Sequence, residues 1–214
     1  YQLLSNYPSA SHIANATLEE LSSLLSEASN GRFDYSKAEL IQYTAKNSIG
    51  SIMPAKSLEL KHTIKLIQEL DSEIDEIERE IKIIMDKINS HILTIPGISY
   101  RMGAMILSEI GSFSKFDSPD KILAFAGLSP STYQSGNFNS SHSHMEKRGS
   151  KYLRYALFNA TKFVCNWDPT FNAYLSKKRA EGKHYNVAIS HATKKLVRVM
   201  FHLEKTGQDF LKVA

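Results

Sequence analysis

The stretch that decides the fold is Ile95-Pro96-Gly97-Ile98-Ser99, which is followed by Ala104, Ile106 and Leu107. A tight Pro-Gly turn lies between two apolar segments, and a small residue stands where a second helix must pass close to the first. This pattern predicts a helix-hairpin-helix motif. In such a turn, backbone N–H groups at a helix N-terminus lack intrahelical partners and can hold a phosphate. We therefore expect Gly97, Ile98 and Ser99 to bind a nucleic-acid backbone.

Two further motifs follow the hairpin. Residues 125–136 read FAGLSPSTYQSG, and residues 147–155 read KRGSKYLRY. Between them lies a polar loop, 131–143, which is too rich in Ser, Asn and Gly to be helical throughout. Loops of this length within a compact domain usually carry a function. The loop stands between a phosphate-binding turn and a basic helix start, and this layout suits chemistry on DNA.

Serine hydroxyls in this loop are the candidate nucleophiles. A serine hydroxyl is a weak nucleophile at neutral pH and needs activation by a base, a cation or a metal-polarised phosphate. Ser135 is well placed because the following Gly136 lets the backbone approach a substrate closely. The residues alone leave the choice open, since loop serines are often only solvated. The candidates are Ser129, Ser131, Ser135, Ser140 and Ser141.

Four basic residues follow the loop: Lys147, Arg148, Lys151 and Arg154. If a helix begins near Ser150, Lys151 and Arg154 lie three positions apart and share a face. Beside a nucleophile loop, these cations are candidates for binding phosphates and for stabilising charge on a reacting phosphorus. The alternative interpretation is an ordinary solvated basic surface.

The three motifs PGIS, FAGLSPSTYQSG and KRGSKYLRYAL, in this order, resemble the C-terminal domain of the insertion-sequence one-ten group of transposases, which also includes the Piv DNA invertases. The resemblance covers nearly the whole chain and is strongest between Leu93 and Leu157. It implies that Ser135, within Tyr133-Gln134-Ser135-Gly136, attacks a DNA phosphodiester and becomes covalently joined to the strand. The family usually has a small hydroxyl residue where this chain has Glu146, which places a carboxylate near the expected DNA path.

The resemblance also implies partners beyond these residues. Family members carry an upstream RuvC-like domain whose acidic residues bind Mg2+, and no segment here reads as that domain. Because the chain begins at Tyr1 rather than Met, we expect a piece of a longer protein that binds DNA and self-associates but does not recombine DNA alone. A structured RNA from the mobile element is a further implied partner of the full-length protein. No cofactor is expected in this chain.

The composition agrees with a globular protein that binds a polyanion. The chain has 214 residues, of which 42% are hydrophobic and 22% charged, close to ordinary globular values. Between His144 and Lys195 the sequence has eleven basic and three acidic residues, a net charge of +8. This charge favours nucleic acid over a membrane as the partner. The single cysteine, Cys165, excludes an internal disulfide and is expected in the core. We expect a soluble cytoplasmic protein associated with the bacterial nucleoid.

Residues 1–55 are expected to form a short helical segment. Thr17 with Glu20, and Ser36 with Glu39, are predicted capping boxes. Asn30-Gly31 is predicted to end the first of these two helices. The two helices around this turn could be a degenerate second hairpin motif, but an ordinary helical pair is the favoured interpretation.

Residues 56–92 carry a heptad-like apolar seam that predicts a long coiled-coil helix, ended by Thr94 and Pro96. Acidic side chains between Glu69 and Glu80 flank the seam and should keep this helix away from DNA. A helix with one apolar stripe needs a partner helix, either from the first fifty residues or from a second copy. A homodimer or higher oligomer is favoured because the run is too long for the short helices to cover. The apolar positions are Leu60, Ile64, Ile67, Leu70, Ile74, Ile77, Ile81, Ile84 and Ile88.

Residues 93–214 are predicted to be a further helical domain, which makes the whole chain all-α. Ser118-Pro119 should start one helix, and others should begin near Ser150 and Asn186. His142 and His144 are too weak a signal for a metal site. Trp167 and Phe171 are interpreted as core or interface residues. The expected buried residues include Leu123, Phe125, Ala126, Val187, Ala188, His191, Leu196, Val199 and Met200.

Two other classes of function compete with the recombinase hypothesis. The first is a non-catalytic DNA-binding adaptor that uses the hairpin and the basic helices only for attachment. The second is a structural coiled-coil assembly protein, which would show no salt-dependent DNA binding.

Overall fold

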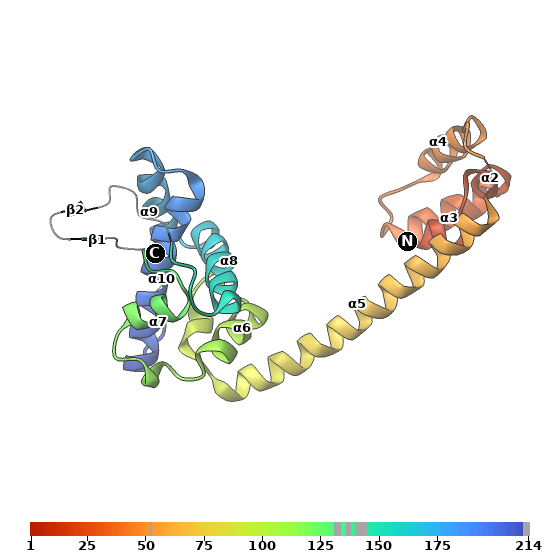
Figure 1. Ribbon diagram of the computed structural model, residues 1–214. Coiled ribbons are helices and arrows are strands. Elements are labelled where there is room, and N and C mark those ends of the chain that lie inside the picture. Colours follow the sequence, from red (N-terminus) through yellow and green to blue (C-terminus); the bar gives the residue numbers. More distant parts are fainter. Residues whose placement is uncertain (52, 131–133, 136–137, 140–144, 212–214) are drawn as a thin grey trace. The chain divides into compact units, whose positions relative to one another are not determined.

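The computed structural model describes residues 1–51, 53–130, 134–135, 138–139 and 145–211 (Figure 1). The described residues are almost entirely helical, so the all-α prediction is confirmed; two short strands pair antiparallel. In chain order, the elements are α1 (Gln2–Asn6), α2 (Ala10–Asn15), α3 (Leu18–Ala28), α4 (Tyr35–Lys46), α5 (Pro54–Ile88), the 3₁₀ helix η1 (His91–Thr94), α6 (Tyr100–Ile110), the 3₁₀ helix η2 (Phe113–Lys115), α7 (Pro119–Phe125), β1 (Gln134–Ser135), β2 (Phe138–Asn139), α8 (Lys151–Trp167), α9 (Pro169–Ala180) and α10 (Tyr185–Thr206).

The chain divides into two compact units, Tyr1–Glu76 and Ile77–Ala214, and the division falls within α5. None of the described helices combines the length and the apolar character needed to cross a bilayer.

In the first unit, α3 begins with the capping box that the sequence predicts. The Thr17 hydroxyl accepts from the Glu20 N–H, and the Glu20 carboxylate accepts from the Thr17 N–H. The predicted box at Ser36 is wrong. Asp34 caps α4 instead, because its carboxylate accepts the Lys37 N–H at 3.2 Å and the Ser36 hydroxyl at 2.6 Å. Ser36 is therefore already within the first turn.

The long helix α5 begins at Pro54 and ends at Ile88, not at Thr94 and Pro96 as the sequence suggests. Asn89, with φ of 48°, takes the left-handed conformation that stops the helix before η1. Ile64 is buried in the first unit and Met85 in the second, while much of the predicted seam is exposed. Its partner helix remains a prediction. The exposed seam positions are Leu70, Ile74, Ile77, Ile84 and Ile88.

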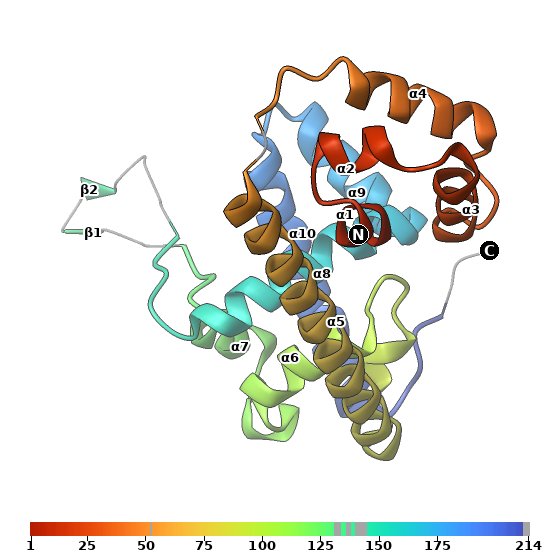
Figure 2. The ribbon, with the colours of Figure 1, turned by 90° about the vertical axis from the view of Figure 1, so that its right-hand side faces the viewer.

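In the second unit, α8 packs against α6, α9 and α10, while α10 also contacts α7, η1 and η2 (Figures 1 and 2). The buried face of α8, from Leu153 to Cys165, joins the main hydrophobic core. Within that core the Thr161 hydroxyl donates to the Thr193 hydroxyl at 3.0 Å, and both side chains are fully buried. Each hydroxyl also lies within hydrogen-bond distance of the carbonyl four residues earlier, so the two hydroxyl protons are shared among three acceptors. A polar pair thus holds α8 and α10 together, since a buried hydroxyl needs a partner.

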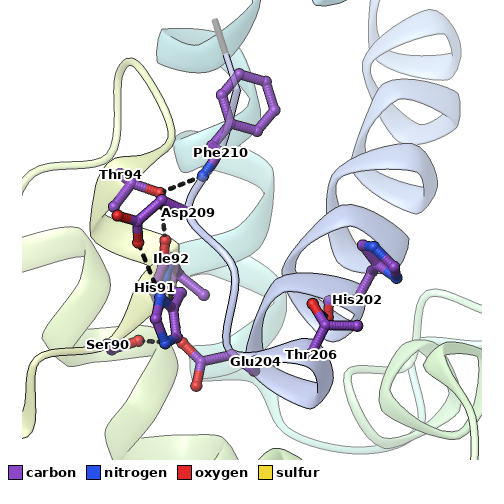
Figure 3. A network of polar contacts seen from close by, with 9 residues as sticks. All are labelled: Ser90, His91, Ile92, Thr94, His202, Glu204, Thr206, Asp209 and Phe210. Atoms are coloured by element: carbon purple, nitrogen blue, oxygen red, sulfur yellow. Dashed lines mark hydrogen bonds and ion pairs between the residues drawn. The ribbon is translucent and has the colours of Figure 1, made fainter.

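The end of α10 is tied to η1 by side-chain hydrogen bonds (Figure 3). Glu204 Oε1 accepts the Ser90 hydroxyl at 2.5 Å and the Ile92 N–H at 3.2 Å. Asp209 Oδ1 contacts His91 Nδ1 at 2.8 Å, and the Phe210 N–H donates to Thr94 Oγ1. Glu204 therefore satisfies backbone and hydroxyl donors at the start of η1.

Several burial predictions need correction. Phe125 and Val187 are 42% and 46% exposed, although the apolar pattern places both in the core. Phe171 is buried, as expected. Trp167 is 71% exposed, which excludes the core and leaves its interpretation as an interface residue a prediction. The helix α9 follows Trp167 after one residue, Asp168, which caps its start by accepting the Phe171 N–H.

We predict that Glu204→Ala lowers the free energy of unfolding of the second unit by about 2–3 kcal/mol, because it leaves donors of the buried residues Ser90 and Ile92 without their charged acceptor. Urea denaturation measures the loss. Asp209→Ala is the matched control: its carboxylate is 70% exposed, and a surface ion pair contributes at most about 1 kcal/mol. Equal losses in the two variants would contradict this account of the network.

Candidate nucleic-acid interface

The predicted hairpin turn rests directly on α8. Gly97 has φ of +93°, and a Cβ atom placed on it would lie 2.7 Å from the backbone carbon of Phe163. Ile95 and Ile98 are buried on either side of the turn. The close approach explains why glycine is needed here, since any side chain would push the turn off the helix.

The sequence predicts backbone donors for a phosphate at the turn before α6. The Ser99 side chain caps the helix by accepting the Met102 N–H at 3.3 Å. The Ile98 N–H donates to the Ile95 carbonyl within the turn. The amides of Gly97 and Ser99 have no protein hydrogen-bond partner among the described residues. Phosphate binding at these three residues remains a prediction.

The ends of the polar loop are held together by backbone pairing. The Ser150 N–H donates to the Phe125 carbonyl at 2.8 Å, and the Lys147 N–H donates to the Gly127 carbonyl at 3.1 Å. Pro130 and Met145 form the last antiparallel bridge before the loop. We call residues 125–130 with 145–150 the loop neck.

Two glycines make this pairing possible. Gly127 and Gly149 have φ of +67° and +118°, a region that favours glycine. A Cβ on Gly127 would meet the backbone of Lys147 and Arg148, and one on Gly149 would meet the backbone of Phe125. The two segments of the loop neck, 125–130 and 145–150, are therefore in direct contact through their backbone atoms.

Side chains from two helices then fix the loop neck. Arg154 Nη1 donates to the Ala126 carbonyl at 2.9 Å and to the Lys147 carbonyl at 3.3 Å. The Ser150 hydroxyl caps α8 by accepting the Leu153 N–H and donates to Glu109 of α6 at 2.5 Å. Part of the Arg154 guanidinium is thus hydrogen-bonded within the protein. The sequence signals the Ser150 cap but not its partner Glu109, because that contact joins residues far apart in the chain.

The other predicted cations lie beside the loop neck. Lys147, Arg148 and Lys151 are exposed, and none of the ion pairs found among the described residues involves them. Lys151 Nζ lies 4.9 Å from the centre of the Tyr152 ring. Glu146 is also exposed on the loop neck. The structure thus brings the four basic residues to the start of α8, and their phosphate contacts remain a prediction.

Ser135 lies in β1, where its backbone pairs with Phe138 of β2. Its neighbours in the motif, Tyr133 and Gly136, fall outside the described residues. Ser129 is described and half-buried, and its carbonyl accepts the Glu146 N–H in the loop neck. The nucleophilic role of Ser135 remains a prediction. Also outside the described residues are Ser131, Ser140, Ser141, His142 and His144.

A groove of about 490 Å³ runs between the loop neck and α10. Burial lowers the pKa of His191 on its wall, and the nearby Lys178, Lys194 and Lys183 lower it further. Its imidazole is therefore neutral at pH 7. The lining residues are Leu128, Pro130, Met145, Val187, Ser190, His191 and Lys194.

Cys165 offers no alternative nucleophile. It is 1% exposed, and burial, reinforced by the charge of Asp168, raises the pKa of its thiol to about 11. Since the thiolate is the reactive form, this side chain is inert at neutral pH. In the part of the chain that the structure describes, no group of three or more His, Cys, Asp or Glu side chains is placed to hold a metal ion.

A basic C-terminal half, a glycine turn that rests on α8 and a polar loop whose ends are paired are features expected of a protein that binds a polyanion. Residues 89–176 match the family model described as Transposase IS116/IS110/IS902 family. The matched residues contain all three motifs whose resemblance to this family is described above, so this part of the chain is similar to that family of transposases.

Curated relatives agree with this similarity. The chain is 30% identical over 120 residues to an uncharacterized 43.6 kDa protein of insertion element IS110 from Streptomyces coelicolor, covering 55% of this chain and 29% of that protein. It is 25% identical over 208 residues to a 42 kDa protein of insertion element IS900 from Mycobacterium paratuberculosis, covering 93% and 51%. It is 30% identical over 124 residues to the pilin gene-inverting protein of Moraxella bovis, covering 58% and 38%. The chain thus spans about half or less of the length of these relatives.

We predict that Gly97→Ala destabilises the second unit by about 3 kcal/mol or more, since it combines left-handed strain with a clash against the α8 backbone. Gly182→Ala separates the two causes. Gly182 has φ of +78° but nothing within 4 Å of its Cβ position, so its variant should lose only about 1–2 kcal/mol. Thermal and urea unfolding of both variants measure the difference, and similar losses would show that the turn does not press on α8.

Proposed function

We propose that this chain is the DNA-binding and strand-joining part of a transposase, and that Ser135 is its nucleophile. The observation that carries the proposal is the loop neck, which anchors both ends of the Ser135 loop at the start of α8. There Lys147, Arg148 and Lys151 are exposed and Arg154 is half-buried. A nucleophile loop fixed beside a cluster of cations suits attack on a phosphodiester.

The proposed reaction is a transesterification at phosphorus. The Ser135 Oγ forms a bond to phosphorus while the bond from phosphorus to the leaving strand's oxygen breaks. The hydroxyl proton passes to solvent or to a base of the full-length protein, and the leaving oxygen takes up a proton. The covalent serine–DNA ester keeps the energy of the broken phosphodiester, so a second strand hydroxyl can displace the serine and rejoin the DNA.

Other parts of the proposed activity lie outside this chain. We propose that an upstream RuvC-like domain supplies Mg2+, which would polarise the reacting phosphate when bound. A structured RNA is a proposed partner of the full-length protein. Self-association through the exposed seam of α5 is proposed to bring two copies together. This chain alone is expected to bind DNA without recombining it.

Because Lys147 and Arg148 are proposed to contact phosphates, we predict that DNA affinity depends measurably on salt concentration. For duplex DNA, the slope of the logarithm of the binding constant against the logarithm of salt concentration changes by about 0.9 per phosphate contact. The double variant Lys147→Ala with Arg148→Ala should therefore reduce the slope by about 2. The control variant, Lys61→Ala with Lys65→Ala on the acid-flanked α5, should leave it nearly unchanged. A slope unaffected by the first variant would remove these two residues from the interface.

Ser135→Ala in the full-length protein tests the nucleophile. Loss of the hydroxyl should abolish both covalent protein–DNA adducts and transposition, while DNA affinity changes little because the phosphate contacts remain. Denaturing gel electrophoresis of labelled DNA detects the adduct, and a filter-binding assay gives the affinity. Ser129→Ala, at the loop neck, is the matched control and should retain adduct formation.

Retained activity in Ser135→Ala would favour another nucleophile. If the unaltered full-length protein binds DNA but forms no adduct and transposes nothing, the non-catalytic adaptor is the better description. No salt-dependent DNA binding at all would favour a purely structural coiled-coil protein.

A further inference from the structure

Four large aromatic side chains stand exposed along one side of α8. Tyr152, Tyr155, Phe163 and Trp167 expose 60%, 62%, 50% and 71% of their surfaces. At 3.6 residues per turn they fall within roughly a third of the helix circumference, and they extend over roughly 22 Å of its length. We call these four residues the aromatic stripe.

Folding of the second unit does not require the aromatic stripe. The opposite face of α8 supplies the core through residues such as Leu157 and Val164, which are fully buried. Scattered exposed apolar residues are common, but four large aromatics on one side of a single helix indicate a binding surface. We therefore expect the aromatic stripe to bind another molecule.

The charge around the aromatic stripe is positive. Between Lys151 and Trp167, α8 has three basic residues and no acidic one. Lys162 Nζ lies 5.1 Å from the ring centre of Phe158, beside the stripe. The acidic cap that follows α8, Asp168, is 2% exposed and accepts a backbone N–H. A polyanion fits this surface better than an acidic or neutral protein face does.

The two regions proposed to bind phosphate lie at different points along α8. The Gly97 turn rests on the backbone of Phe163, in the second half of the helix. The loop neck lies at its start, where Lys151 Nζ is 4.9 Å from the ring centre of Tyr152. Both regions therefore lie along the helix that carries the aromatic rings.

We propose that the aromatic stripe binds an unpaired DNA strand by base stacking. Exposed rings stack on bases whose faces are free, and flanking lysines bind the sugar-phosphate backbone. A paired duplex hides its base faces, so the stripe selects unpaired over paired DNA. The inference rests on the proposed function in that it takes DNA as the substrate. It adds that the strand is unpaired where it crosses α8.

Trp167 provides a direct probe because it is the only tryptophan in the chain. Titration of the 214-residue chain with an oligothymidylate should quench Trp167 fluorescence and give an affinity. Tyr152→Ser and Tyr155→Ser should each weaken that affinity about tenfold, in line with the loss of one stacked base, and leave duplex affinity unchanged. Their melting temperatures should match that of the parent, since both side chains are exposed.

The matched control is Tyr43→Ser. Tyr43 is 69% exposed in the first unit, so its loss should not alter strand binding. Oligothymidylate affinity that survives both stripe substitutions would overturn the proposal. So would binding of oligouridylate without oligothymidylate, which assigns the stripe to RNA. Weaker self-association in sedimentation with unchanged strand binding would assign it to a second copy of the chain.

The two proposals fail in distinguishable ways. If Ser135→Ala keeps full activity while the stripe variants lose strand binding, only the assigned nucleophile is wrong. If Ser135→Ala abolishes adducts while the stripe variants bind the strand normally, only the aromatic stripe is wrong.

Discussion

Bare backbone contact between Gly127 and Gly149 is the constraint on which the second unit's functional region depends. The two segments bond through peptide groups because neither carries a side chain at the contact. Arg154 then spans both segments through the carbonyls of Ala126 and Lys147. The ends of the Ser135 loop, the exit of α7 and the first turn of α8 are thereby fixed by one junction, so a change at either glycine would move all of them together.

The helix α8 is the common support for features that are distant in sequence. It carries the loop neck at its start, receives the Gly97 turn along its length, and is joined to α10 through the buried pair of Thr161 and Thr193. Because each threonine also bonds to its own helix, neither hydroxyl is left unsatisfied if the helices separate slightly. The pair thus favours one alignment of α8 on α10 without a buried charge, which would cost far more to desolvate.

Local signals in the sequence predict local structure well. The Thr17 capping box, the Asn30-Gly31 stop and the Ser118-Pro119 start are each set by neighbours within four residues, and all three are found. Ser36 fails because Asp34 caps the helix two residues earlier, where its carboxylate accepts the Lys37 N–H and the Ser36 hydroxyl. The exposed faces of Phe125 and Trp167 could not be predicted, since periodicity marks an apolar side chain but not whether a neighbour covers it. Glu109 and Glu204 were missed for the same reason: their partners lie 41 and 112 or more residues away.

The buried thiol of Cys165 has a practical consequence. With 1% of its surface exposed and its pKa raised to about 11, it will barely react with maleimide or methanethiosulfonate reagents in the folded chain at neutral pH. A cysteine introduced on the surface can then be labelled selectively without first removing the native one. Spectroscopic probes could thus be attached to either unit while the core around α8 keeps its natural packing.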